Sequence, residues 1–159
     1  MKYEIACNWD PALIAGVAGS LADELFFVMP NSPVSGGRAS FVAVETTPEF
    51  VKKYVAEAHK KGLIFNFLLN ASCLDNMEYQ REGNKKIVEH IAWIDSIDVD
   101  AVTVTIPFLL QIIKKQFPRL KVKISSFARV NTPRTAKYWE DWGADSIVLD
   151  EDITRDFKM

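Results

Sequence analysis

Cysteine is scarce in this chain of 159 residues, which contains only Cys7 and Cys73. A zinc or iron–sulfur cage needs several ligands at short spacing, so two distant cysteines do not form one. Both cysteines lie near the ends of predicted strands, where reduced thiols of a cytosolic protein are expected. The sequence therefore predicts no metal site and no cofactor in this chain, and a cytoplasmic location.

Long apolar runs are also missing, and the charge is nearly balanced. No apolar stretch approaches the roughly 20 residues that span a bilayer, and the first residues lack the apolar core of a signal peptide. The 19 basic and 21 acidic side chains give a formal net charge of −2. No membrane partner is expected, and the overall charge gives no reason to expect nucleic-acid binding. Glycine-rich phosphate loops, HExxH and GxSxG motifs are absent as well.

The sequence does contain a repeated alternation of strand and helix. Hydrophobic periodicity and helix-end signals predict six strands, at 3–7, 25–29, 63–69, 101–105, 122–126 and 146–149. Helices are expected from about 11, over 48–61, over 77–97 with a break near Gly83, over 107–117, over 133–142 and from 153. A short extended piece is expected at 41–44. Regular alternation implies parallel strands in one domain over 1–159.

Alternate residues of most strands differ in polarity, which favours a barrel over a flat sheet. Phe65 and Phe67 alternate with Asn66, and valines alternate with Thr103. Strands between two helix layers should be apolar on both faces, so a polar face predicts a lumen. A closed barrel of this kind needs eight strands. The expected fold class is α/β with parallel (βα) repeats, a partial TIM-barrel-like domain of about six strands from the first part of a longer protein.

Charged residues occur in the sets assigned to the lumen. A buried charge must find a partner. Glu4 and Lys123 are candidates to neutralise each other inside the barrel. The alternative is that both lie at solvated strand starts, and the sequence leaves the two interpretations open.

Polar residues collect after the predicted strands, at the edge where parallel α/β folds bind ligands. They are Asn8, Asp10, Asn31, Asn70, Cys73, Thr105, Ser125, Ser126, Arg129, Asp150, Glu151 and Asp152. Such amides and hydroxyls suit a small polar ligand better than one familiar reaction. Asn8, Asn70, Ser125, Arg129 and Asp150 are the candidate binding residues among them.

Two short segments have a functional and a structural interpretation each. The acidic run 150–152 could bind a divalent cation, but capping of the next helix is favoured. Ser35–Arg38 could hold an anion through backbone amides and Arg38, although glycine turn formation is the simpler explanation. Cys73 has conceivable bases in His59 and His90, yet both lie on predicted helices, so no thiol-protease dyad is expected.

A succession of short motifs resembles the collagenase-like peptidases, peptidase family U32. The motifs are Gly36-Gly37-Arg38, Phe65–Ala71 with Cys73-Leu74, Ala101–Val104 with Pro107-Phe108-Leu109, Leu120-Lys121-Val122 with Ser125-Ser126, Gly143-Ala144-Asp145, and Thr154–Phe157. They cover nearly the whole chain in the family's order. The resemblance implies the first part of a TIM-barrel-like domain, in agreement with the polarity of the strands.

The resemblance implies several activities. Some members are described as proteases, and others support hydroxylation of transfer RNA, ribosomal RNA or a quinone precursor, some with an iron–sulfur cluster. The family's cysteines lie beyond residue 159, so a cluster would belong to a following part. Many members carry an arginine–glutamate pair after the sixth strand, where this chain has Glu151-Asp152. Arg155 is the candidate to serve instead, and no catalytic residue carries over.

The sequence thus predicts a U32-type peptidase domain with a polar ligand site at the carboxyl ends of the strands. Alternatives are a non-proteolytic member that assists hydroxylation, and a binding module for a polar, peptide or RNA-derived ligand. An open barrel exposes strand edges, so self-association through the first or sixth strand is also expected.

Overall fold

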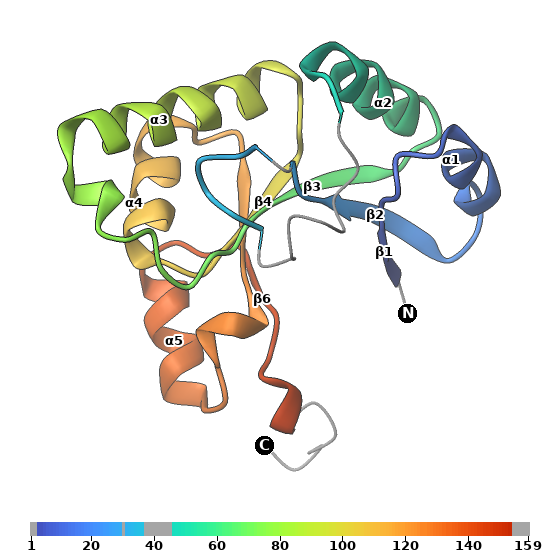
Figure 1. Cartoon of the computed structure of the whole chain (residues 1–159). Helices are drawn as coiled ribbons and strands as arrows, with labels where there is room; N and C mark the ends of the chain where they lie inside the picture. The colour runs from blue at the N-terminus through green and yellow to red at the C-terminus, as the bar shows by residue number, and fades with distance from the viewer. Residues whose placement is uncertain (1–2, 30, 37–45, 154–159) are drawn as a thin grey trace.

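The computed structural model describes residues 3–29, 31–36 and 46–153. Six parallel strands in these ranges form one sheet in which each strand pairs with the next along the chain. The strands are β1 (Tyr3–Ala6), β2 (Ala22–Phe27), β3 (Ile64–Leu69), β4 (Ala101–Val104), β5 (Lys121–Ile124) and β6 (Ser146–Ile147). The helices are α1 (Pro11–Val17), α2 (Pro48–Lys60), α3 (Arg81–Ser96), α4 (Pro107–Gln116) and α5 (Pro133–Asp141). Figure 1 shows the helices along the outside of a curled sheet.

This arrangement confirms the predicted fold class. Strand order follows chain order throughout, as in a (βα) barrel, and the curled sheet makes up part of one. Short 3₁₀ helices complete the connections, namely η2 (Met77–Tyr79), η3 (Ser126–Ala128) and η4 (Glu151–Ile153). Within the described ranges, each helix is too short or too polar to cross a bilayer.

The outward face of the strands forms the apolar core with the helices. Phe65 and Phe67 of β3 are completely buried there, together with Ile91 of α3 and Leu109 of α4. Burying one such side chain stabilises the fold by about 2 kcal/mol. The apolar alternate positions therefore hold the helices against the sheet, as the sequence pattern predicts.

The inward face carries a chain of polar contacts that crosses the lumen. Lys123 Nζ lies 2.6 Å from Glu4 Oε1 and 2.6 Å from Glu24 Oε1. Asn66 Nδ2 donates to the same Glu24 oxygen at 2.6 Å, and Thr103 Oγ1 donates to Asn66 Oδ1 at 3.0 Å. We call these five residues the lumen network. They come from five different strands, so the polar residues converge on the barrel axis.

The lumen network bears on one sequence alternative and corrects one strand. Glu4 and Lys123 do pair, with Lys123 buried at 10% exposure and Glu4 at a solvated strand start at 47% exposure, so each interpretation holds for one of the two residues. Their third partner was missed because the second strand was predicted over 25–29, whereas β2 begins at Ala22. The earlier start places Glu24 on the inner face, where its side chain is 12% exposed.

The third predicted helix is divided in two, at a different position from the one expected. Gln80 is extended and separates η2 from α3, so the break precedes Gly83. A Cβ on Gly83 would lie 2.2 Å from the Met77 carbonyl oxygen, so the close packing of η2 on α3 requires glycine. The extended piece expected at 41–44 and the sixth helix beyond Ile153 fall outside the described residues.

The sheet has two open edges in the described residues. β1 and β6 each have a neighbouring strand on one side only. Tyr3 beside one edge is 43% exposed, and Leu149 beside the other is 44% exposed. Unpaired backbone groups next to apolar side chains favour pairing with another chain.

We expect replacement of Lys123 by methionine to destabilise the fold by about 3 kcal/mol, because the buried Glu24 carboxylate would lose its cation. Urea unfolding would measure the change. Lys60→Met is the matched control, since Lys60 pairs with Glu57 on the surface, where such bridges contribute about 0–1 kcal/mol. Equal losses for the two variants would contradict a structural role of the lumen network.

We further expect self-association through the open edges, with a sedimentation coefficient that rises with protein concentration. Tyr3→Lys should weaken the association, because a lysine on an edge opposes strand pairing. Tyr79→Lys in η2 makes the same charge change at an exposed side chain that follows β3, in the middle of the sheet. A monomer at all concentrations, or equal effects of the two substitutions, would refute edge pairing.

Candidate functional site

The carboxyl ends of neighbouring strands are joined by polar side chains. Asn70, which follows β3, donates from Nδ2 to Ser125 Oγ at 3.1 Å after β5. Thr105, which follows β4, donates from Oγ1 to the Asn70 carbonyl oxygen at 3.0 Å. Three consecutive strand ends are therefore linked at the edge where parallel α/β folds bind ligands.

Ser125 also shapes the loop that follows β5. Its Oγ accepts a hydrogen bond from the Phe127 backbone N–H at 3.2 Å and so caps η3. η3 ends at Arg129, whose φ of 51° places it in the left-handed region. This turn directs the Arg129 side chain toward the segment after β6.

Asp150, in that segment, is only 1% exposed. Its Oδ1 accepts a hydrogen bond from the Asp152 backbone N–H at 3.0 Å. Arg129 Nε lies 3.1 Å from Asp150 Oδ2, and the same guanidinium lies 3.1 Å from Asp152 Oδ2. The contact with Asp150 Oδ2 is within ion-pair distance, but no hydrogen bond is directed at this oxygen.

Asn70 contains a second such acceptor. The residue is 8% exposed, and within the described residues its Oδ1 accepts no hydrogen bond although Nδ2 is engaged. A buried acceptor left without a hydrogen bond costs about 1–3 kcal/mol. Binding sites are where such a cost can be recovered, because a ligand can supply the missing donor.

A cavity of about 220 Å³ adjoins these groups, and we call it the rim pocket. Its lining consists of Ser72, Ser126, Phe127, Arg129, Asp150 and Glu151. The pocket combines hydroxyls, carboxylates and one guanidinium with the ring of Phe127, which is 49% exposed. It can bind a small polar group attached to an apolar one.

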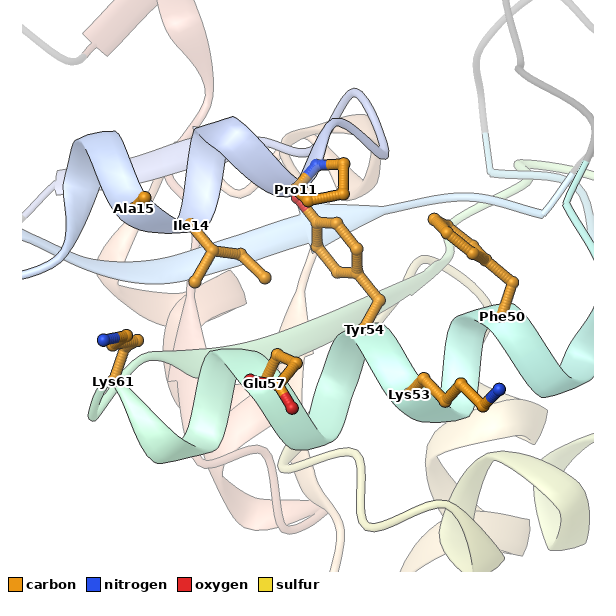
Figure 2. A pocket seen from close by; sticks show the side chains of 8 residues that line it. All are labelled: Pro11, Ile14, Ala15, Phe50, Lys53, Tyr54, Glu57 and Lys61. Atoms are coloured by element: carbon orange, nitrogen blue, oxygen red, sulfur yellow. The ribbon is translucent and has the colours of Figure 1, made fainter.

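A larger cavity of about 320 Å³ lies between α1 and α2, remote from this chemistry. Figure 2 shows Tyr54 and Ile14 between the two helices, with Lys53 and Lys61 at the margins. Tyr54 OH donates to the Asp10 carbonyl oxygen at 2.8 Å, and burial raises the pKa of Tyr54, so the phenol stays protonated. The cavity is mostly apolar, and we interpret it as a packing groove.

The structure separates one predicted site residue from the others. Asn8 is exposed and accepts a hydrogen bond from the Asp10 backbone N–H at 3.1 Å, so it shapes the turn before α1. Asn70 and Ser125 are hydrogen-bonded together, and Arg129 and Asp150 share the rim pocket. The remaining two predicted residues, Arg38 and Arg155, fall outside the described residues.

Ser72 and Phe127 line the rim pocket but were not predicted as site residues. Phe127 directly follows two serines after a strand, and an aromatic residue in such a polar loop is the signal that could have identified it. Ser72 had no comparable signal, since short polar loops are common at this edge.

The histidines and cysteines do not form a catalytic pair in the described part of the chain. His59 Nε2 contacts Asp100 Oδ2 at 2.8 Å, and His90 Nε2 contacts Ser32 Oγ at 2.9 Å. Cys73 is exposed, while burial raises the pKa of the Cys7 thiol and keeps it protonated. Neither histidine contacts a thiol.

The described residues do not fit a metal ion or an iron–sulfur cluster. Across 3–29, 31–36 and 46–153, no three His, Cys, Asp or Glu side chains are grouped as metal ligands. Cys7 follows β1 and Cys73 follows β3, with no further thiol beside either. Within the acidic run, Asp150 is buried while Asp152 is exposed and pairs with Arg129, an arrangement that caps η4 rather than one that surrounds a cation.

Comparison with known proteins identifies relatives. The sequence profile of peptidase family U32 matches residues 17–156. An uncharacterized protease of Methanocaldococcus jannaschii is 30% identical over 143 residues, which are 87% of this chain and 41% of that protein. The chain therefore spans less than half the length of this curated relative.

Solved structures share the fold. A U32 peptidase superposes with a TM-score of 0.74 at 21% identity, over 96% of this chain and 60% of that one. An N-acetylmannosamine-6-phosphate 2-epimerase from Clostridium perfringens superposes with a TM-score of 0.52 at 20% identity, over 89% of this chain and 55% of that one. At such identities these likenesses establish the fold alone.

We expect the free energy of unfolding to fall as the pH drops from about 6.5 to about 4, in part because of His90. Burial lowers the pKa of His90 from 6.5 to about 4. Between these values the unfolded chain binds the proton and the folded chain does not, so acid favours unfolding. His90→Gln keeps a polar partner for Ser32, and its chemical denaturation should show a shallower pH dependence. An unchanged pH dependence would contradict the assignment.

Proposed function

The chain belongs to peptidase family U32, and from this premise we propose that its rim pocket binds peptide substrates for hydrolysis. The reaction is assigned to the whole protein, to which this chain contributes the rim pocket. We also propose a cytoplasmic location, supported by two cysteines that form no disulfide.

The observation that carries this proposal is Asp150 Oδ2, a buried carboxylate oxygen of the pocket lining that accepts no hydrogen bond within the described residues. A peptide presents N–H groups that can supply the missing donor. The hydroxyls of Ser72 and Ser126 can pair with further polar groups of the backbone, and Phe127 can pack on an apolar side chain. The rim pocket thus complements a peptide in both polarity and size.

These residues bind and orient the substrate in our proposal. Peptide hydrolysis also requires an activated nucleophile, for which the described residues provide no paired base. Asp150 is held in place by the Asp152 backbone N–H and the Arg129 guanidinium. The Asp152 N–H holds the carboxylate through Oδ1, so Oδ2 can accept from a peptide N–H group once the exposed Arg129 side chain moves aside.

A second candidate is a binding module without catalysis. His59 and His90 favour it, because both are engaged elsewhere and leave the rim pocket without an imidazole base. In this case the rim pocket would hold the same kind of ligand, and no product would form.

Asp150→Asn provides the test. The substitution preserves shape and Oδ1 but removes the charge, and the loss of a charged acceptor costs about 1.5–3 kcal/mol. We therefore expect kcat/KM for a peptide library to fall at least tenfold. Glu89→Gln on α3, where Glu89 pairs only loosely with Lys85 at 3.9 Å, is the matched control and should retain full activity.

Thermal unfolding would verify that both variants are folded. Hydrolysis that persists undiminished in Asp150→Asn would place the substrate elsewhere. Absence of hydrolysis by the folded whole protein, combined with peptide binding that Asp150→Asn abolishes, would favour the binding module.

A further inference from the structure

We propose that the rim pocket binds a primary ammonium group, and that Arg129 competes with it for Asp150. This inference rests on the proposed peptide-binding function and specifies which part of the ligand is recognised. The free amino terminus of a peptide and a lysine side chain both present this group.

Charge in the pocket favours a cation. One guanidinium, that of Arg129, lies between two carboxylates, Asp150 and Asp152, at 3.1 Å from each. Together with Glu151, which also lines the pocket, these described groups carry two negative charges in excess, three carboxylates against one guanidinium. A positively charged ligand would reduce this excess, whereas an anion would add to it.

Hydrogen bonding favours the same ligand. Asp150 Oδ2 in the pocket lining is a buried acceptor that receives no hydrogen bond within the described residues, and Asn70 Oδ1, whose amide contacts Ser125, is another. A primary ammonium group has three N–H donors and no acceptor. In the rim pocket, the hydroxyl oxygens of Ser72 and Ser126 offer further acceptors beside Asp150.

A divalent metal ion fits the pocket less well. In the described residues, no three His, Cys, Asp or Glu side chains around Asp150 are grouped closely enough to hold a metal ion. The Arg129 guanidinium also lies next to Asp150 Oδ2, where it would repel a doubly charged ion more strongly than an ammonium group.

Arg129 must move aside for the ligand to reach Asp150 Oδ2, because this oxygen is buried. The Arg129 side chain is 63% exposed and can turn into solvent, whereas Asp150 is only 1% exposed. A buried carboxylate without a cation is costly, so displacement requires that the ammonium group replace the charge of Arg129. Arg129 shields the buried carboxylate while the pocket is empty, and the ammonium group takes its place when a ligand binds.

This competition gives the two side chains opposite effects. Asp150→Asn should weaken ammonium binding at least tenfold. Arg129→Gln should tighten it about two- to fivefold, because the competing cation is gone. If the pocket instead bound a carboxylate or phosphate through Arg129, the second substitution would weaken binding.

Titration calorimetry on the full chain tests the proposal with four probes. They are the tripeptide amide Ala-Phe-Ala-NH₂, its N-acetylated form, N-acetyl-lysine amide and MgCl₂. We expect the free tripeptide to bind at least tenfold more tightly than the acetylated one. Binding of N-acetyl-lysine amide would show that a lysine side chain can supply the group, and its failure to bind would assign the pocket to amino termini. Glu89→Gln should match the wild type.

Equal binding of the free and acetylated tripeptides would overturn the proposal. So would weaker ammonium binding in Arg129→Gln, or Mg²⁺ binding at the pocket in place of the ammonium probes. Ammonium binding without any peptide hydrolysis would remove the hydrolytic function and leave this inference standing. Hydrolysis of free and acetylated peptides at equal rates would refute this inference and leave the hydrolytic function standing.

Discussion

A single buried lysine joins the inward faces of this curled sheet. Lys123 on β5 reaches across the lumen to carboxylates of β1 and β2, and the remaining polar contacts of the lumen network attach β3 and β4 to them. Outside the barrel, apolar side chains can hold helices on a flat sheet as well as on a curled one. The polar contacts in the lumen distinguish a curled sheet from a flat one, because they form only if the inward faces of the strands converge. The helices, the strand ends and the rim pocket are all positioned by that convergence.

Two groups of polar residues share the inward face and differ in how fully they are paired. Toward the amino ends, Lys123, Glu24 and Asn66 have partners among themselves. Toward the carboxyl ends, Asn70 and Asp150 each keep an acceptor without a hydrogen bond. Since a folded chain tends to satisfy its buried polar atoms, the exceptions are informative. They separate the part of the interior that stabilises the fold from the part that we propose binds a ligand.

Sequence reasoning succeeded where side-chain alternation carried the signal. The polarity of Asn66 and Thr103 against their apolar neighbours predicted the lumen and, through it, the fold class. It failed where the first residue of a strand determined which side chains face the lumen. β2 begins at Ala22, and this start includes Glu24 in the strand, on the inner face of the sheet. The rim was predicted as a set of strand ends, but the sequence could not show which of them touch. Asn8 proved to form a local turn. Arg129 contacts Asp150 from a left-handed backbone conformation, which the identity of an arginine does not predict.

The span of the lumen network along the chain has a kinetic consequence. Glu4 and Lys123 are separated by 119 positions, so their pairing closes a very large loop. Local strand–helix units can assemble as the polypeptide emerges from the ribosome, but the first strand must wait for the fifth before its carboxylate is neutralised. Contacts between residues so distant in sequence slow folding, because the entropy of loop closure is lost before they form. The lysine of the fifth strand is thus the contact of the lumen network that spans the most of the chain.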